Sequence, residues 1–158
     1  MIKKLHHAAY RCKNSEETRK FYENFLGLKL VNAFEINETQ TGRKTSVLHS
    51  FYEMDDNSCI AFFEAPDQPF VFKDQHDFDL HIALEVSYEN LIKMFKKGKK
   101  EKIDTRGISD HGFISSIYFR DPNGYVVELT AKKADHDTHL HANNQKARAI
   151  LDDWTKSA

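Results

Sequence analysis

Polar and apolar residues alternate along Asp79-Leu80-His81-Ile82-Ala83-Leu84-Glu85-Val86. This alternation is typical of a β-strand that buries one face and leaves the other face open. Because successive side chains of a strand point to opposite faces, the leucines, the isoleucine and the valine share the buried face. The open face carries one imidazole, His81, beside the small side chain of Ala83, which leaves space in front of the ring. A lone strand histidine usually faces solvent, so this strand by itself does not predict a site.

A second strand, at residues 4–12, repeats this pattern and also carries a histidine on its open face. Aligning the two strands on His7 and His81 places Ala9 on Ala83. Because the chain contains nearly the same strand twice, a shared role for the two histidines becomes a working hypothesis.

Each of these strands is followed by a helical pattern. After the first strand, Asn14 is placed to cap a helix that has Glu17 at its third position, and Gly27 is placed to end it. After the second strand, residues 88–97 repeat the apolar stripe, with Gly98 near its end. Strand-like segments then follow at residues 29–36, 45–54 and 58–65, and at residues 105–107, 115–120 and 125–130. Each half is therefore predicted to be β-α-β-β-β.

Composition limits the class of protein. The chain has 158 residues, 30% of them charged, and a net charge of −1. This length supports a core without metal or disulfide help, and the balanced charge argues against a nucleic-acid binder. The sequence begins without an apolar targeting segment and contains no stretch of transmembrane length, so we expect a cytoplasmic protein without a membrane partner. The cysteines, Cys12 and Cys59, lack zinc-ligand spacing and are expected to be reduced and buried.

The repeat also sets the expected domain boundaries. These are residues 1–133 for a single domain, 4–66 and 78–131 for its two modules, and 134–158 for a polar linker and a C-terminal helix. The C-terminal helix is expected to dock through the apolar side chains Ile150, Leu151 and Trp154.

A tight turn is predicted at Asp121-Pro122-Asn123-Gly124, between the last two strands. Proline suits the first central position of such a turn and glycine suits its left-handed position, so Asp121 should face Tyr125. Counting back along both strands places Tyr118 opposite Glu128, and directly opposed residues share a face. A carboxylate beside a phenol is either part of a site or a surface pair, and the hairpin alone does not decide between them.

The same count, applied to a turn centred on Asp56-Asn57, pairs His49 with Glu64. One additional loop residue would shift the register and remove this pairing.

Four stretches together resemble the vicinal oxygen chelate superfamily, over residues 4–131. They are Leu5-His6-His7-Ala8-Ala9, the stretch ending in Phe25-Leu26-Gly27-Leu28, Asp79-Leu80-His81-Ile82-Ala83, and Ser116-Ile117-Tyr118-Phe119-Arg120-Asp121-Pro122-Asn123-Gly124-Tyr125-Val126-Val127-Glu128-Leu129. The superfamily includes glyoxalase I, bleomycin and fosfomycin resistance proteins, methylmalonyl-CoA epimerase and type I extradiol dioxygenases. The resemblance implies an α+β fold in which paired βαβββ modules form a cup-shaped mixed sheet, here with an extra C-terminal helix.

The resemblance also implies a divalent metal inside the cup. The ligand positions of the extradiol branch fall on His7, His81 and Glu128, and two histidines with one carboxylate suit Fe(II). Glyoxalase-type members use a fourth ligand, for which Glu64 is the nearest candidate, and Ni(II), Zn(II) and Mn(II) are the alternative metals. His6 falls on the neighbouring face of the strand and is expected to have no role.

Two further residues match positions of the extradiol branch. Tyr118 matches the tyrosine that this branch places before its final turn, and His111 matches its acid–base histidine, although the spacing is slightly short. An exposed loop histidine is the alternative for His111. In the extradiol reading, His111 moves a proton while Tyr118 hydrogen-bonds an oxygen bound to the metal.

Three functions follow from the resemblance, in a stated order. The first is an Fe(II) ring-cleavage dioxygenase that acts on a catechol-like substrate with O2. The second is a glyoxalase-like lyase or isomerase, and the third is a metal-free drug-binding protein, which would not need three polar ligands. The expected partner is a small molecule that chelates the metal through adjacent oxygens. No nucleic acid is expected, and a homodimer is left open.

Overall fold

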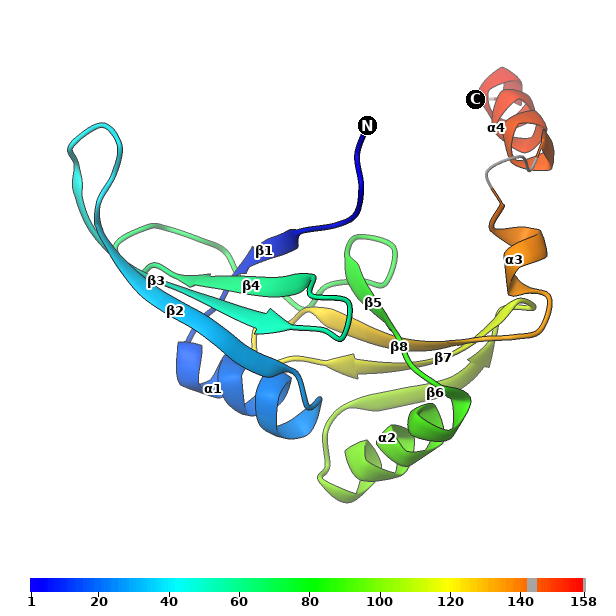
Figure 1. The fold of residues 1–158 in the computed structure, drawn as a ribbon, viewed down its shortest axis with the longest axis horizontal. Coiled ribbons are helices and arrows are strands. Elements are labelled where there is room, and N and C mark those ends of the chain that lie inside the picture. Colours follow the sequence, from blue (N-terminus) through cyan, green and yellow to red (C-terminus); the bar gives the residue numbers. More distant parts are fainter. Residues whose placement is uncertain (142–144, 158) are drawn as a thin grey trace. The chain divides into compact units, whose positions relative to one another are not determined.

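Two four-stranded sheets carry the predicted repeat (Figure 1). The strand order is β1-β4-β3-β2 in the first sheet and β5-β8-β7-β6 in the second, so corresponding strands occupy corresponding places. A helix follows the first strand of each sheet. The predicted α+β class and the β-α-β-β-β order are confirmed.

The computed structural model describes residues 1–141 and 145–157. The strands of the first sheet are β1 His7–Arg11, β2 Lys29–Glu38, β3 Lys44–Glu53 and β4 Cys59–Glu64. Those of the second sheet are β5 His81–Glu85, β6 Thr105–Asp110, β7 Ile114–Arg120 and β8 Val126–Lys132. The helices are α1 Ser15–Arg19, η1 Lys20–Phe25, α2 Tyr88–Lys100, α3 His136–His139 and α4 Gln145–Ser157. The main difference from the prediction is β6, which runs to Asp110 rather than ending at residue 107.

The chain forms two compact units. The first unit contains Met1–Ile82 and Arg120–Val127, and the second contains Ala83–Phe119 and Glu128–Ala158. The turn between β7 and β8 therefore belongs to the first unit, although it comes from the second half of the sequence.

The two faces of the first sheet have different roles. Strand β1 pairs in parallel with β4, so that His7 lies opposite Cys59 and Tyr10 opposite Phe62. The ring of Tyr22, from η1, packs 4.6 Å from Phe62 between ring centroids, so the helix covers the face that carries Phe62. Because His7 has the opposite parity along the strand, its side chain belongs to the face away from this helix.

The first helix begins as the sequence predicts and then changes geometry. Asn14 caps it, since its Oδ1 accepts a hydrogen bond from the Glu17 backbone N–H at 2.9 Å. From Lys20 the helix is a π-helix, and its buried side chains are the aromatic residues Phe21, Tyr22 and Phe25. The wider turn brings three bulky rings onto the side of the helix that faces the sheet. Gly27 follows with a φ of +89°, a conformation that favours glycine after a helix.

A buried carboxylate holds the turn between β7 and β8. Asp121 is 5% exposed and its Oδ1 accepts hydrogen bonds from the backbone N–H groups of Asn123 (2.9 Å) and Tyr125 (2.8 Å). Its Oδ2 accepts from the Asn123 side chain (3.0 Å) and from the phenol of Tyr22 (3.0 Å). Asn123 Oδ1 in turn accepts from the Lys13 backbone N–H at 2.8 Å. These contacts attach the predicted turn to the start of the first helix and to η1.

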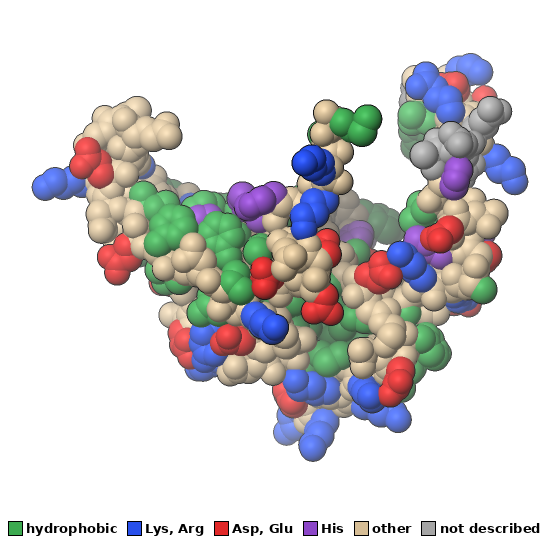
Figure 2. Space-filling view, viewed as in Figure 1, with side chains coloured by type: hydrophobic (Ala, Val, Ile, Leu, Met, Phe, Trp, Pro, Cys, Tyr) green, Lys and Arg blue, Asp and Glu red, His purple; other side chains and the backbone are tan. Residues whose placement is uncertain are grey.

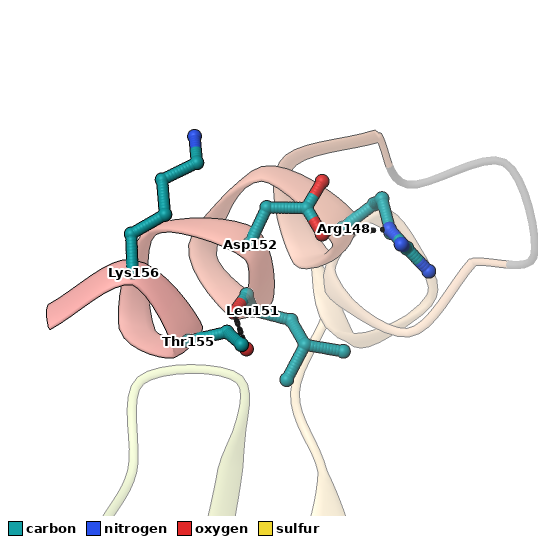
Figure 3. A pocket seen from close by; sticks show the side chains of 5 residues that line it. All are labelled: Arg148, Leu151, Asp152, Thr155 and Lys156. Atoms are coloured by element: carbon teal, nitrogen blue, oxygen red, sulfur yellow. Dashed lines mark hydrogen bonds and ion pairs between the residues drawn. The ribbon is translucent and has the colours of Figure 1, made fainter. Parts of the chain in front are cut away.

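The C-terminal helix forms, but the prediction that it docks through its apolar side chains is wrong. Ile150, Leu151 and Trp154 are 70%, 55% and 73% exposed. Few residues of this helix are apolar, and it is stabilised along its own surface by ion pairs such as Arg148–Asp152 at 3.0 Å (Figure 3). None of the described helices is long and apolar enough to span a membrane.

Replacing Asp121 with alanine removes the acceptor of four hydrogen bonds. Each buried donor left without a partner costs about 1–3 kcal/mol, so the free energy of unfolding should fall by at least about 3 kcal/mol. Chemical denaturation followed by circular dichroism measures this change. The control Tyr22→Phe removes one donor and should cost about 1 kcal/mol. An Asp121→Ala loss no larger than that of the control would contradict the role given to this carboxylate.

Burial raises the pKa of Asp121, which predicts a pH dependence of stability. The folded protein holds this proton at pH values where the unfolded chain, with a pKa of about 3.9, has released it. The contribution to stability is therefore largest below the unfolded pKa and declines as the pH rises through the folded value. Compared with Asp121→Asn, the wild-type free energy of unfolding should fall over this interval and then level off. A difference that grows with pH would mean that the folded pKa is lowered instead.

Candidate functional site

The helix-free face of the first sheet gathers aromatic rings around His7. Phe51 lies 5.4 Å from His7, and His49 lies 6.5 Å from it, between ring centroids. Phe34, which is 43% exposed, packs against both Phe51 (6.1 Å) and His49 (5.4 Å). In Figure 2, histidine side chains lie at the surface next to a group of apolar side chains. The face therefore combines imidazole nitrogens with an aromatic wall.

His7 is in contact with the histidine that precedes it. The two Nδ1 atoms of His6 and His7 are 2.8 Å apart, within hydrogen-bond distance. The backbone of His6 is itself held, because its carbonyl accepts a hydrogen bond from the Cys59 N–H at 3.0 Å. The expectation that His6 lies on the helix side of the strand is wrong, because β1 begins only at His7 and His6 does not follow the alternation of the strand.

His49 is a buried histidine whose environment the sequence did not indicate. It is 6% exposed, stacks on Phe63 at 3.7 Å between ring centroids, and its Nδ1 lies 3.0 Å from the Phe62 carbonyl oxygen. A carbonyl only accepts, so Nδ1 carries the proton and Nε2 carries the lone pair. Burial lowers the pKa of His49, and the hydrogen bond to Phe62 opposes this only in part. This imidazole is therefore neutral near pH 7 and able to accept a proton at Nε2.

Glu64 does not pair with His49, contrary to the prediction. In the β3–β4 ladder, His49 lies opposite Phe63, and Glu64 lies opposite Leu48. The turn closes through the Met54 N–H and the Ser58 carbonyl, one residue away from the predicted register. A one-residue shift moves every side chain to the other face.

Glu64 consequently belongs to the helix-covered face of the first sheet. Its Oε2 accepts the backbone N–H of Ser15, the first residue of α1, at 2.6 Å. A carboxylate is favoured at a helix N-terminus, where backbone N–H groups lack partners within the helix. The β4 positions that share a face with His7 are instead Cys59, Ala61 and Phe63.

His81 begins strand β5, and its ring is oriented by the backbone. Its Nδ1 lies 2.8 Å from the carbonyl oxygen of Asp77, which fixes the proton on Nδ1 and the lone pair on Nε2. The connector that supplies this carbonyl is fixed nearby by a hydrogen bond from the Gln75 N–H to the Gly124 carbonyl at 2.9 Å.

In the second unit, His111 and Tyr118 are brought together. His111 Nε2 lies 2.7 Å from the Tyr118 phenol oxygen, and the Arg106 guanidinium lies 5.3 Å from the centre of the Tyr118 ring. The sequence proposed both residues for one site but gave no contact between them. The contact forms because β7 begins directly after the turn that carries His111, whose N–H donates to the Ile114 carbonyl at 3.0 Å.

Glu128 is a buried carboxylate on β8, 5% exposed. The Asp121 N–H donates to the Tyr125 carbonyl at 2.9 Å, which confirms the predicted closing pair of the hairpin. Further along the same strands, Ser116 Oγ donates to Thr130 Oγ1 at 3.3 Å. Both contacts agree with the count that places Glu128 opposite Tyr118.

Neither of the two largest hollows contains the predicted catalytic residues. A hollow of about 440 Å³ lies along α4, lined by Arg148, Leu151, Asp152, Thr155 and Lys156 (Figure 3). A second, of about 290 Å³, lies at the ends of β1 and β4 and is lined in part by Arg11, Lys13 and Glu64. Within residues 1–141 and 145–157, no group of three or more His, Cys, Asp or Glu side chains is arranged to hold a metal ion.

Comparison with known proteins identifies the family. Residues 4–129 match the model of the Glyoxalase/Bleomycin resistance protein/Dioxygenase superfamily, and the chain belongs to that superfamily. The predicted resemblance is thereby confirmed. Lactoylglutathione lyases from two Neisseria meningitidis strains, of serogroups A and B, are each 28% identical over 142 residues, covering 85% of this chain and 95% of the relative.

Solved structures support the fold. A variant of the fosfomycin resistance protein FosX from Listeria monocytogenes, in complex with Mn(II) and 1S,2S-dihydroxypropylphosphonic acid, superposes with a TM-score of 0.65 at 18% identity. That match covers 87% of this chain and 99% of FosX. A glyoxylase/bleomycin resistance protein/dioxygenase domain from Frankia sp. EAN1pec gives a TM-score of 0.67 at 14% identity, covering 84% and 100% of the two chains.

The protonation of His49 is directly measurable. We expect its imidazole to carry the proton on Nδ1 and to titrate below the ordinary histidine pKa of about 6.5, because burial disfavours the charged ring. Long-range ¹⁵N–¹H correlation spectra across a pH series report both properties. The solvated His139, which is an exposed residue, serves as the reference ring. An Nε2–H tautomer, or titration at or above the reference, would contradict the assignment.

Proposed function

We propose that this protein is a divalent-metal enzyme of the superfamily and that His7, His81 and Glu128 hold its metal. Each histidine has Nδ1 engaged by a neighbour, which suits binding through Nε2. Glu128 supplies a buried carboxylate. Two neutral imidazoles and one carboxylate with open positions favour Fe(II), with Mn(II), Ni(II) and Zn(II) as alternatives.

The position of Glu64 favours three protein ligands over four. Its carboxylate is engaged with the Ser15 N–H on the face of the first sheet that α1 and η1 cover. The corresponding position on the His7 face is Ala61, which cannot bind a metal. We therefore leave Glu64 out of the proposed ligand set and give it the role of capping α1.

For the reaction we propose extradiol-type cleavage of a catechol-like ring by O2. A bound divalent ion would supply Lewis acidity to two adjacent substrate oxygens. The observation that carries this choice is the 2.7 Å contact between His111 Nε2 and the Tyr118 phenol, with Tyr118 on the strand beside Glu128. Both oxygen atoms of O2 enter the ring-opened product, so no external reductant is needed.

Three side chains of the chain itself would handle protons and oxygens in this reaction. A neutral imidazole accepts the proton that a catechol hydroxyl must lose, and both His111 and His49 are candidates for this step. Tyr118 would hydrogen-bond a reacting oxygen while His111 holds its phenol in place. The aromatic wall of Phe34 and Phe51 would contact the flat face of the ring.

A glyoxalase-type isomerisation is the second candidate, favoured by one specific observation. The lactoylglutathione lyases of Neisseria meningitidis are covered over 95% of their length by this chain at 28% identity. Such a reaction moves a proton between neighbouring carbon atoms and consumes no O2, which separates it cleanly from ring cleavage.

Oxygen uptake distinguishes the two candidates. Protein purified without air and loaded with Fe(II) should consume O2 on addition of a catechol and form a yellow ring-opened product. The same protein loaded with Ni(II) or Zn(II) should not. No uptake across a panel of substituted catechols, in protein shown to hold Fe(II), would move the assignment to the isomerase.

Variants of the paired residues should fail differently. Tyr118→Phe keeps the ring and loses one hydrogen bond, so turnover should fall modestly. His111→Ala removes a proton-transfer group and should lower the rate about 10²–10⁴-fold. Both variants should retain metal, because neither residue is a proposed ligand. Loss of metal in either one would contradict these roles.

A further inference from the structure

We infer that His6 is a positioning residue for the metal ligand His7, an inference that rests on the metal centre proposed above. The sequence offered no role for His6. The structure places its Nδ1 at 2.8 Å from Nδ1 of His7, with ring centroids 5.0 Å apart and the ring planes at 76°. This edge-on arrangement directs one ring nitrogen toward the other.

The position of His6 is set by the backbone. Its carbonyl accepts the Cys59 N–H at 3.0 Å, which joins the residue before β1 to the beginning of β4. The next residue, His7, lies opposite Cys59 in the parallel ladder. The two imidazoles are therefore presented from one short segment that β4 holds in place.

The tautomers decide which histidine can bind a metal through Nε2. A hydrogen bond between two Nδ1 atoms needs a proton on one of them and a lone pair on the other. If His6 donates, the proton of neutral His7 lies on Nε2, which then cannot bind. If His7 donates, its Nε2 carries the lone pair. Only the arrangement in which His6 accepts leaves His7 ready as a ligand.

The other ligand histidine is oriented in the same chemical sense by a different group. His81 donates from Nδ1 to the backbone carbonyl of Asp77 at 2.8 Å. Metal-binding histidines commonly donate their second ring N–H to such a partner, which fixes the ring and raises its basicity. For His7, a side chain supplies this acceptor, so substitution can remove it while leaving the ligand in place.

Metal affinity of the variants tests the inference. His6→Phe keeps a flat ring but has no acceptor, and it should weaken metal binding about 10–100-fold, the usual cost of losing such a partner. His6→Asn places a carbonyl oxygen close to the former Nδ1 and should recover most of the affinity. His139→Ala, which removes an exposed histidine, is the matched control and should bind as the wild type does. Anaerobic competition titration with a metal indicator measures all four proteins.

A second readout needs no metal. In the metal-free wild type, ¹⁵N–¹H spectra should place the His7 ring proton on Nδ1. In His6→Phe the proton should redistribute between the two nitrogens, and in His6→Asn it should return to Nδ1. Circular dichroism establishes that each variant is folded.

The outcomes separate this inference from the proposed function. If the wild type binds metal, His7→Ala abolishes binding and His6→Phe has no effect, the inference is wrong while the metal centre stands. Equal weakening in His6→Phe and His6→Asn would also overturn it, because a lost acceptor cannot explain that result. A wild type that binds no divalent metal overturns both proposals.

Discussion

The first unit depends on a buried carboxylate that pairs with four donors. Asp121 binds two backbone N–H groups of its own turn, the amide of Asn123 and the phenol of Tyr22. Burial raises the pKa of both Asp121 and Tyr22, and the hydrogen bond between them is what compensates each for the loss of water. Through this network, a turn from the second half of the sequence becomes part of the first unit. The same turn fixes where the two strands that carry Tyr118 and Glu128 begin to pair.

The chemistry of the candidate site is determined by what each imidazole does with its Nδ1 atom. His49 and His81 both donate to backbone carbonyl oxygens, and His7 contacts the ring of His6. Hydrogen bonds of this kind leave Nε2 as the basic nitrogen, which suits a metal ligand and a proton acceptor equally. Location then separates the two roles, because burial among aromatic rings lowers the pKa of His49, while His7 stands at the exposed end of β1.

The sequence predicted most of the fold and part of the site. Alternation along residues 79–86 and the Asn14 cap are local signals, and the structure contains both a strand and a helix start there. The pairing of His49 with Glu64 failed because it depended on the length of one turn, which no local signal determines. The role of His6 was missed because alternation was extended one residue beyond the strand. The exposed face of α4 was wrongly expected to be buried, since amphipathic spacing gives a direction but not a partner.

The direct test of the metal centre is X-ray absorption spectroscopy of protein purified and loaded with Fe(II) under anaerobic conditions. The account predicts one metal per chain with two imidazole ligands, oxygen donors for the rest and no sulfur. His7→Ala and His81→Ala should each reduce the number of bound imidazoles to one, and Glu64→Gln should leave the spectrum unchanged. A sulfur donor, an imidazole count that neither histidine variant alters, or a ligand lost in Glu64→Gln would contradict the account.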